Sequence, residues 1–72
     1  MKEVFINKDQ VELFKILKFE GIASSGAEAK DMIASGTVLV NGIIEKQKRK
    51  KMVAGDTIEW KGEVFRLILG DH

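Results

Sequence analysis

The stretch "SGAEAKDMIASGTVLVNG", residues 25–42, decides the fold because its hydrophobic period changes part-way along. Before Gly36 the apolar residues recur at helical spacing, and after it β-branched residues alternate as in a strand. Ser25 and Glu28 have the spacing of a capping box, which predicts the start of the helix. Asn41–Gly42, between two β-branched runs, predicts a two-residue hairpin. A capped helix followed by a hairpin is therefore expected here.

A second helical segment is predicted just before this stretch, in "NKDQVELFKILKFEG", residues 7–21. Asp9 and Glu12 have the same capping-box spacing, so we expect Asp9 to cap the first turn. Gly21 suits the left-handed position at which many helices stop. Small alanine side chains in the second helix would let the helices lie close together. The two predicted helices form an αα unit with a short bend.

Further strands are predicted on both sides of the helices. "EVFI" (3–6) is short and apolar, and "AGDTIEW" (54–60) and "EVFRLIL" (63–69) are joined by a turn at Lys61–Gly62. The predicted fold class is α+β, with a helix pair packed on one side of a small, mainly antiparallel sheet. The length of 72 residues predicts a single domain, residues 1–72.

The composition argues against an enzyme and against a bound cofactor or metal. The chain has no cysteine, so it has no disulfide and no thiolate zinc ligand. Its one histidine is the last residue, His72, where we expect a solvated tail and not a catalytic group. No signal-peptide pattern is seen, and no apolar run approaches the roughly 20 residues of a membrane span. We therefore expect a soluble, cytoplasmic, non-catalytic protein without a small-molecule substrate.

The net charge of +1 hides an uneven distribution. Residues 37–53 carry five basic side chains and one acidic side chain, which gives +4, whereas residues 1–36 give −1 and residues 54–72 give −2. The excess lies in "KQKRKK", residues 46–51, which we call the basic segment. Clustered positive charge indicates a polyanionic partner more strongly than net charge does.

The basic segment has two interpretations that charge alone leaves open. If the chain is extended there, Lys46, Lys48 and Lys50 face one way and the residues between them face the other, so neither face enters the core. One interpretation is a solvated edge strand whose lysines discourage edge-to-edge pairing. The other is a binding surface for a polyanion, which Lys15, Lys18 and Lys30 on the helices could widen.

Two weaker features bear on nucleic-acid binding. The helix N-terminus at Ser25–Gly26 could receive a phosphate through its free N–H groups, although ordinary capping also explains it. Phe19 falls on the side of its helix away from Leu13 and Leu17, so it is expected to be exposed. No RNP-like aromatic motif is found, which favours recognition of RNA backbone and shape over base stacking.

The order "LKFEG…SGAEAKDMIASGTVLVNG…E-x5-K…AGD" resembles the RNA-binding domain named after ribosomal small-subunit protein four. It is most similar to the short stand-alone bacterial type, the YbcJ-like and YaaA-like proteins. The resemblance covers about residues 10–68, nearly the whole chain. It implies an αL-type helix pair packed on a small sheet, and a domain that binds structured RNA.

The resemblance also implies which residues face the RNA. Together with the basic charge it gives a predicted RNA-binding set of Lys18, Ser25, Gly26, Lys30, Asn41, Gly42, Lys46, Lys48, Arg49, Lys50 and Lys51. Glu45 is expected to orient a neighbouring basic side chain, because a carboxylate repels phosphate. The chain departs from the family pattern at Gln47, where relatives commonly have arginine. Gly26 stands where longer, multi-domain members often have arginine, which fits the stand-alone type. Lys2, Lys8 and Lys61 are expected to be solvated.

The sequence therefore predicts a monomeric, non-catalytic module that binds structured RNA, such as ribosomal or transfer RNA. The basic segment and the N-terminus of the second helix would make the contacts. Two alternatives stay open. In the first the same surface binds an acidic protein partner, and in the second it binds DNA.

Overall fold

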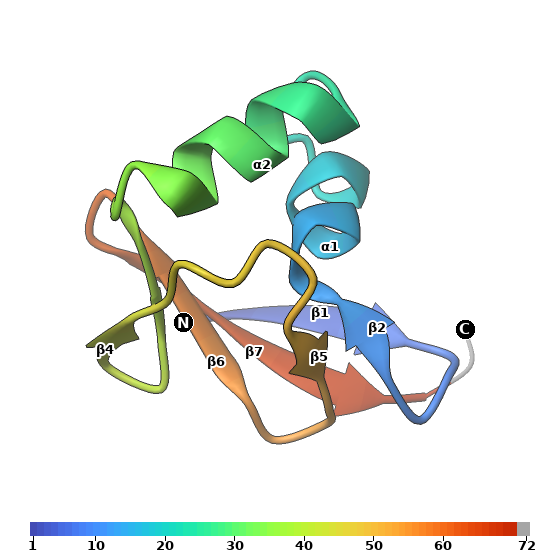
Figure 1. Ribbon diagram of the computed structural model, residues 1–72. Helices are drawn as coiled ribbons and strands as arrows, with labels where there is room; N and C mark the ends of the chain where they lie inside the picture. The colour runs from blue at the N-terminus through green and yellow to red at the C-terminus, as the bar shows by residue number, and fades with distance from the viewer. Residues whose placement is uncertain (71–72) are drawn as a thin grey trace.

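The change of hydrophobic period at Gly36 separates a helical layer from a β layer in the computed structural model, which describes residues 1–70. The helices are α1 (Leu13–Phe19) and α2 (Gly26–Ala34). The strands are β1 (Lys2–Ile6), β2 (Val11–Glu12), β3 (Val38–Val40), β4 (Ile43–Ile44), β5 (Lys51–Met52), β6 (Thr57–Trp60) and β7 (Glu63–Leu69). Both helices lie over the same face of the main sheet (Figure 1). His72 lies outside the described residues.

The main sheet has the strand order β1-β7-β6-β3-β4. Only β1 pairs in parallel, with β7, and the other neighbours are antiparallel. A second, two-stranded antiparallel sheet joins β2 to β5. The α+β class with a mainly antiparallel sheet is confirmed. Among residues 1–70, no helix has the length and apolar character needed to cross a membrane.

The core lies between the helices and the sheet. Strand alternation turns Val38, Val40 and Ile58 inward, and α1 contributes Leu13 and Leu17, which are fully buried. Burying an aliphatic side chain of this size contributes roughly 1.5–3 kcal/mol each. Because no charged or polar residue is buried among the described residues, packing of apolar side chains is what positions the helices on the sheet.

The predicted start of α1 is wrong. Val11 and Glu12 are extended and pair with β5, so Asp9 lies outside the helix and Glu12 makes no side-chain cap. The first N–H groups of α1 donate instead to backbone carbonyls of the basic segment, Leu13 to Lys50 at 2.9 Å and Phe14 to Lys48 at 3.2 Å. A distant segment satisfies these donors, and the local capping box is therefore not needed.

The predicted start and end of α2 are confirmed. The Glu28 N–H donates to Ser25 Oγ at 3.1 Å, and the Glu28 carboxylate accepts from the Ser24 N–H at 2.8 Å. The reciprocal bond thus comes from the residue before the cap. The helix ends at Ala34, and Gly36 follows it with a φ of +83°. This left-handed conformation is the one that glycine adopts at low cost.

The predicted hairpin at Asn41–Gly42 is also confirmed, with φ values of +52° and +83° that suit a type I′ turn. The Asn41 side chain accepts from the Thr57 N–H at 2.9 Å and donates to Asp56 Oδ1 at 3.1 Å. Asn41 therefore ties the β3–β4 hairpin to the turn that precedes β6. Asp56 also accepts from the Val53 N–H at 3.0 Å and so stabilises this turn.

The basic segment is not an extended edge strand, and its expected alternation is wrong. After β4 the chain runs back toward α1, turns at Lys48–Arg49 with the Lys50 N–H donating to Gln47 O at 3.2 Å, and then forms β5. The carbonyls of Lys48 and Lys50 are turned toward α1, because they cap that helix. The segment is thus a shaped loop that the helix N-terminus holds in place.

Candidate nucleic-acid interface

Three cations from different parts of the chain meet around the ring of Phe14, at the start of α1. Lys30 Nζ on α2 lies 4.6 Å from the ring centroid, Arg49 Cζ in the basic segment lies at 5.1 Å, and Lys15 Nζ on α1 lies at 5.9 Å. A cation near an aromatic face gains about 0.5–1 kcal/mol at exposed sites. We call Lys15, Lys30 and Arg49 the cation cluster.

One carboxylate, that of Glu12, holds two members of the cation cluster. Glu12 Oε1 lies 3.2 Å from Lys15 Nζ, and Oε2 lies 3.3 Å from an Arg49 guanidinium nitrogen. The hydrogen bond from Lys15 is the main cause that keeps the pKa of Glu12 below its ordinary value; desolvation opposes it, and the hydrogen bond from Arg49 and the two positive charges lower the pKa further. Glu12 is therefore ionised at neutral pH, and it together with the cluster carries a charge of +2.

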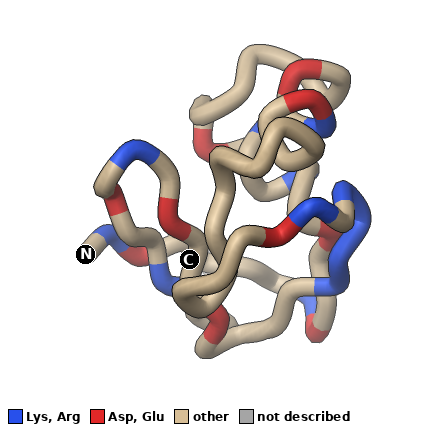
Figure 2. Tube along the Cα trace, turned by 60° about the vertical axis from the view of Figure 1, so that its left-hand side comes forward, with Lys and Arg blue, Asp and Glu red and all other residues tan. Residues whose placement is uncertain are grey.

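The basic segment lies beside the cation cluster, because its backbone caps α1. Figure 2 shows its residues 48–51 as the longest continuous run of Lys and Arg along the tube. Glu45 contacts it at two points: Oε1 lies 3.9 Å from Lys50 Nζ, and Oε2 accepts from the Gln47 N–H at 3.1 Å. This position fits the expected role of orienting a basic side chain. The shorter of the two contacts, however, is the hydrogen bond from the backbone N–H of Gln47.

The predicted residues on α2 also face the cation cluster. A side-chain carbon at Gly26 would lie 3.6 Å from the Phe14 ring, so the N-terminus of α2 passes close to that ring. Ser25 precedes it, and its hydroxyl is used by the cap. Lys30 lies one turn further along and reaches the same ring. Gly26 and Lys30 are therefore brought together with Arg49 at the Phe14 ring.

Other predicted residues lie apart from the cluster or have structural contacts. The Asn41 side chain is occupied by Asp56 and Thr57. Gly42 lies at the exposed tip of the same turn. Lys18 belongs to the last turn of α1 and lines a groove there.

The remaining lysines of the basic segment lie along its length. A side-chain carbon at Gly36 would lie 3.5 Å from the Lys46 stem, while Lys48 is exposed. Lys51 is exposed and stands opposite Glu12 in the β2–β5 pair.

Sequence reasoning missed the two residues that organise the cluster. Phe14 is not among the predicted site residues; it belongs to the core, with 9% of its surface exposed. Glu12 was assigned to a cap that does not form. Recognising the short strand β2 would have kept Glu12 out of the helix and left its carboxylate free for an ion pair.

The model of the S4 domain family matches residues 4–68. This chain belongs to the S4 domain family. The "Putative RNA-binding protein YbcJ" of Escherichia coli K12 is 47% identical over 58 residues, which cover 81% of this chain and 83% of that protein. The "Uncharacterized protein YbcJ" of Shigella flexneri matches to the same extent.

A solution structure of Escherichia coli YbcJ shares the fold, with a TM-score of 0.71 and 42% identity, over 94% of this chain and 87% of that one. It is described as containing an αL motif involved in RNA binding. The αL-type helix pair expected from the sequence is therefore confirmed for this S4 domain.

Proposed function

We propose that this S4 domain binds structured RNA, such as ribosomal or transfer RNA, without catalysing a reaction. The observation that carries the proposal is the meeting of Lys15, Lys30 and Arg49 around the Phe14 ring, beside the basic segment. Cations from α1, α2 and a loop thus form one positive surface. The similarity to the Escherichia coli protein supports the proposal, because that protein's name refers to RNA binding.

The cation cluster suits phosphate binding because its charges are held but not fully neutralised. The Phe14 ring attracts Lys30 and Arg49 without accepting a proton or cancelling their charge. Arg49 presents five N–H donors, and Glu12 accepts a hydrogen bond from one of its guanidinium nitrogens. The other donors of this guanidinium, which is 62% exposed, remain available to a phosphate oxygen.

The basic segment would extend the contact along the RNA backbone. Its loop shape places Lys48, Arg49 and Lys51 at successive exposed positions beside α1. About three to five phosphate contacts are expected, each lowering the log–log salt slope of the affinity by roughly 0.7–0.9. Phosphate contacts position a protein but do not read sequence, so specificity would come from the shape of the RNA. The chain would act as one monomeric, cytoplasmic domain without a cofactor.

The test is a titration of an RNA stem–loop with the wild type and with a Lys48→Ala, Arg49→Ala, Lys50→Ala, Lys51→Ala variant. The backbone carbonyls that cap α1 remain in this variant, so the fold is expected to persist, and circular dichroism checks it. We expect salt-dependent binding by the wild type and a loss of most affinity in the variant. An RNA affinity that changes neither with salt concentration nor with these substitutions would refute the proposal and favour the protein-partner alternative. A preference for duplex DNA in competition would favour the DNA alternative.

A further inference from the structure

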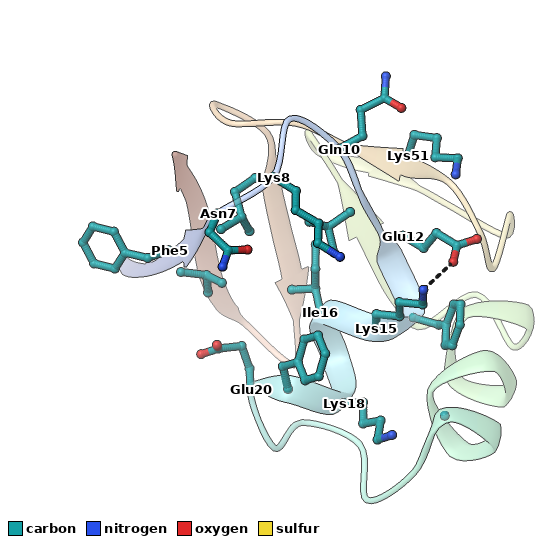
Figure 3. Close-up of a pocket in the computed structure, with 16 residues that line it drawn as sticks. Phe5, Asn7, Lys8, Gln10, Glu12, Lys15, Ile16, Lys18, Glu20 and Lys51 are labelled. Carbon is teal, nitrogen blue, oxygen red and sulfur yellow. Dashed lines mark ion pairs between the residues drawn. The ribbon is translucent and has the colours of Figure 1, made fainter. Parts of the chain in front are cut away.

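A groove of about 630 Å³ runs along α1, between this helix and the connection from β1 to β2 (Figure 3). Lys15, Lys18 and Phe19 line it on the helix side, and Asn7 and Lys8 line it on the other. Figure 3 shows the Lys8 side chain extending from the connection toward α1. Pockets for small molecules commonly measure about 300–1,000 Å³, so the groove has room for a group of nucleotide size.

The groove presents an aromatic ring to water at Phe19, which is 74% exposed at the end of α1. A ring in this position contributes little to the core, because most of its surface is not in contact with other apolar groups. Exposed aromatic rings are the groups on which proteins stack unpaired RNA bases. The sequence predicted the exposure of Phe19 but gave it no partner.

The charge of the groove favours an anionic occupant. Four lysines line it, Lys8, Lys15, Lys18 and Lys51, against two carboxylates, Glu12 and Glu20, which gives a charge of +2. Among residues 1–70, the ion pairs engage only Lys15 of these four and leave out Lys8, Lys18 and Lys51. Lys8, which was expected to be merely solvated, is therefore a cation outside these ion pairs that lines the same groove as Phe19.

The groove is continuous with the surface proposed for phosphates. Glu12, Phe14, Lys15 and Gly26 line it and also belong to, or contact, the cation cluster. Figure 3 shows the Lys15–Glu12 ion pair at its edge. An RNA whose backbone lies on the cluster would thus have the groove immediately beside it.

We propose that this groove takes one unpaired nucleotide of the bound RNA, with its base against the ring of Phe19 and its phosphate near Lys15 and Lys18. The inference rests on the proposed function and adds to it a preference for RNA with a bulged or looped-out residue. Continuity with the cation cluster favours a nucleotide over an acidic peptide, because an RNA bound to the cluster would lie at the edge of the groove.

The experiment compares two RNA probes, a blunt duplex of about 16 base pairs and the same duplex with one bulged adenosine. Each is titrated with the wild type, with Phe19→Ala and with Leu69→Ala. Leu69 is the matched control, because it is 55% exposed and does not line the groove. We expect Phe19→Ala to bind the bulged duplex about tenfold more weakly and the plain duplex as the wild type does. Leu69→Ala should change neither.

A second measurement does not depend on a variant. Titration of the wild type with adenosine monophosphate, followed by amide NMR signals, should shift the signals of Lys18, Phe19 and Lys8. Shifts confined to the basic segment would overturn the inference. So would equal affinities of Phe19→Ala and wild type for the bulged duplex, or equal losses on both duplexes. These results would refute the groove inference but leave the proposed RNA binding intact. The proposed RNA binding would be refuted only if the wild type bound neither duplex.

Discussion

Removing single members of the cation cluster gives the sharpest test of the surface. Arg49→Ala and Lys30→Ala each delete one cation beside the Phe14 ring, from the basic segment and from α2 respectively. Neither residue belongs to the apolar core. The stability cost should therefore be small, about 1 kcal/mol or less for the lost ring contact and exposed ion pair.

The expected loss of RNA affinity follows from counterion release. If each side chain contacts one phosphate, each variant reduces the steepness of the log–log salt slope by roughly 0.7–0.9. We take about 1 M salt as the concentration at which one phosphate contact no longer contributes to the affinity. Extrapolating the slope from there to about 0.15 M salt gives about a fourfold to fivefold loss of RNA affinity for each variant. The double variant should lose about twentyfold, provided that the two contacts are independent.

Lys61→Ala provides the control. It removes the same charge and a similar ring contact, since Lys61 Nζ lies 4.9 Å from the Trp60 ring, but it lies in the β6–β7 turn. Fluorescence anisotropy of a labelled RNA stem–loop, measured over a series of salt concentrations, gives both affinity and slope. If Lys61→Ala weakens binding as much as Lys30→Ala does, affinity follows net charge alone and the reasoning from the cluster is refuted.

Three further predictions follow from contacts within the fold. Ser25→Ala should lower the free energy of unfolding, measured by urea denaturation, by about 1 kcal/mol, because it removes the α2 cap. Asp9→Ala should change this free energy by less than about 0.5 kcal/mol, because Asp9 caps no helix. A larger loss for Asp9→Ala would show that Asp9 caps α1, as the sequence indicated. Asn41→Ala should cost about 2 kcal/mol, because it places alanine at a φ of +52° and removes the bonds to the neighbouring turn. The folded Asn41→Ala variant should keep its RNA affinity, and a selective loss of binding would mean that Asn41 touches RNA. NMR titration of Glu12 should give a pKa below its ordinary value of 4.5. Because the folded-state pKa is the lower one, the Glu12 ion pairs stabilise the fold above pH 4.5, and this contribution is lost as the pH falls through the folded pKa. Glu12→Gln should remove that part of the pH dependence, and an unshifted pKa would contradict the ion pairs.

Local sequence signals predicted the elements that depend on neighbouring residues. The Ser25–Glu28 cap, the turn at Asn41–Gly42 and the helix stop at Gly21, which has a φ of +74°, each need only a few adjacent residues to form. The start of α1 was missed because its N–H groups are satisfied by carbonyls of Lys48 and Lys50, which no local pattern indicates.

The candidate site shows the same division. The sequence by itself determined the fold class and placed Lys30 and Arg49 among the residues expected to face RNA, because charge clustering and family motifs are written along the chain. Only the tertiary structure decided that these cations meet at Phe14, that Glu12 holds one of them, and that Phe19 opens onto a groove. Those contacts join α1, α2 and a loop, and their geometry is set by the packing of the helices on the sheet, which sequence spacing does not encode.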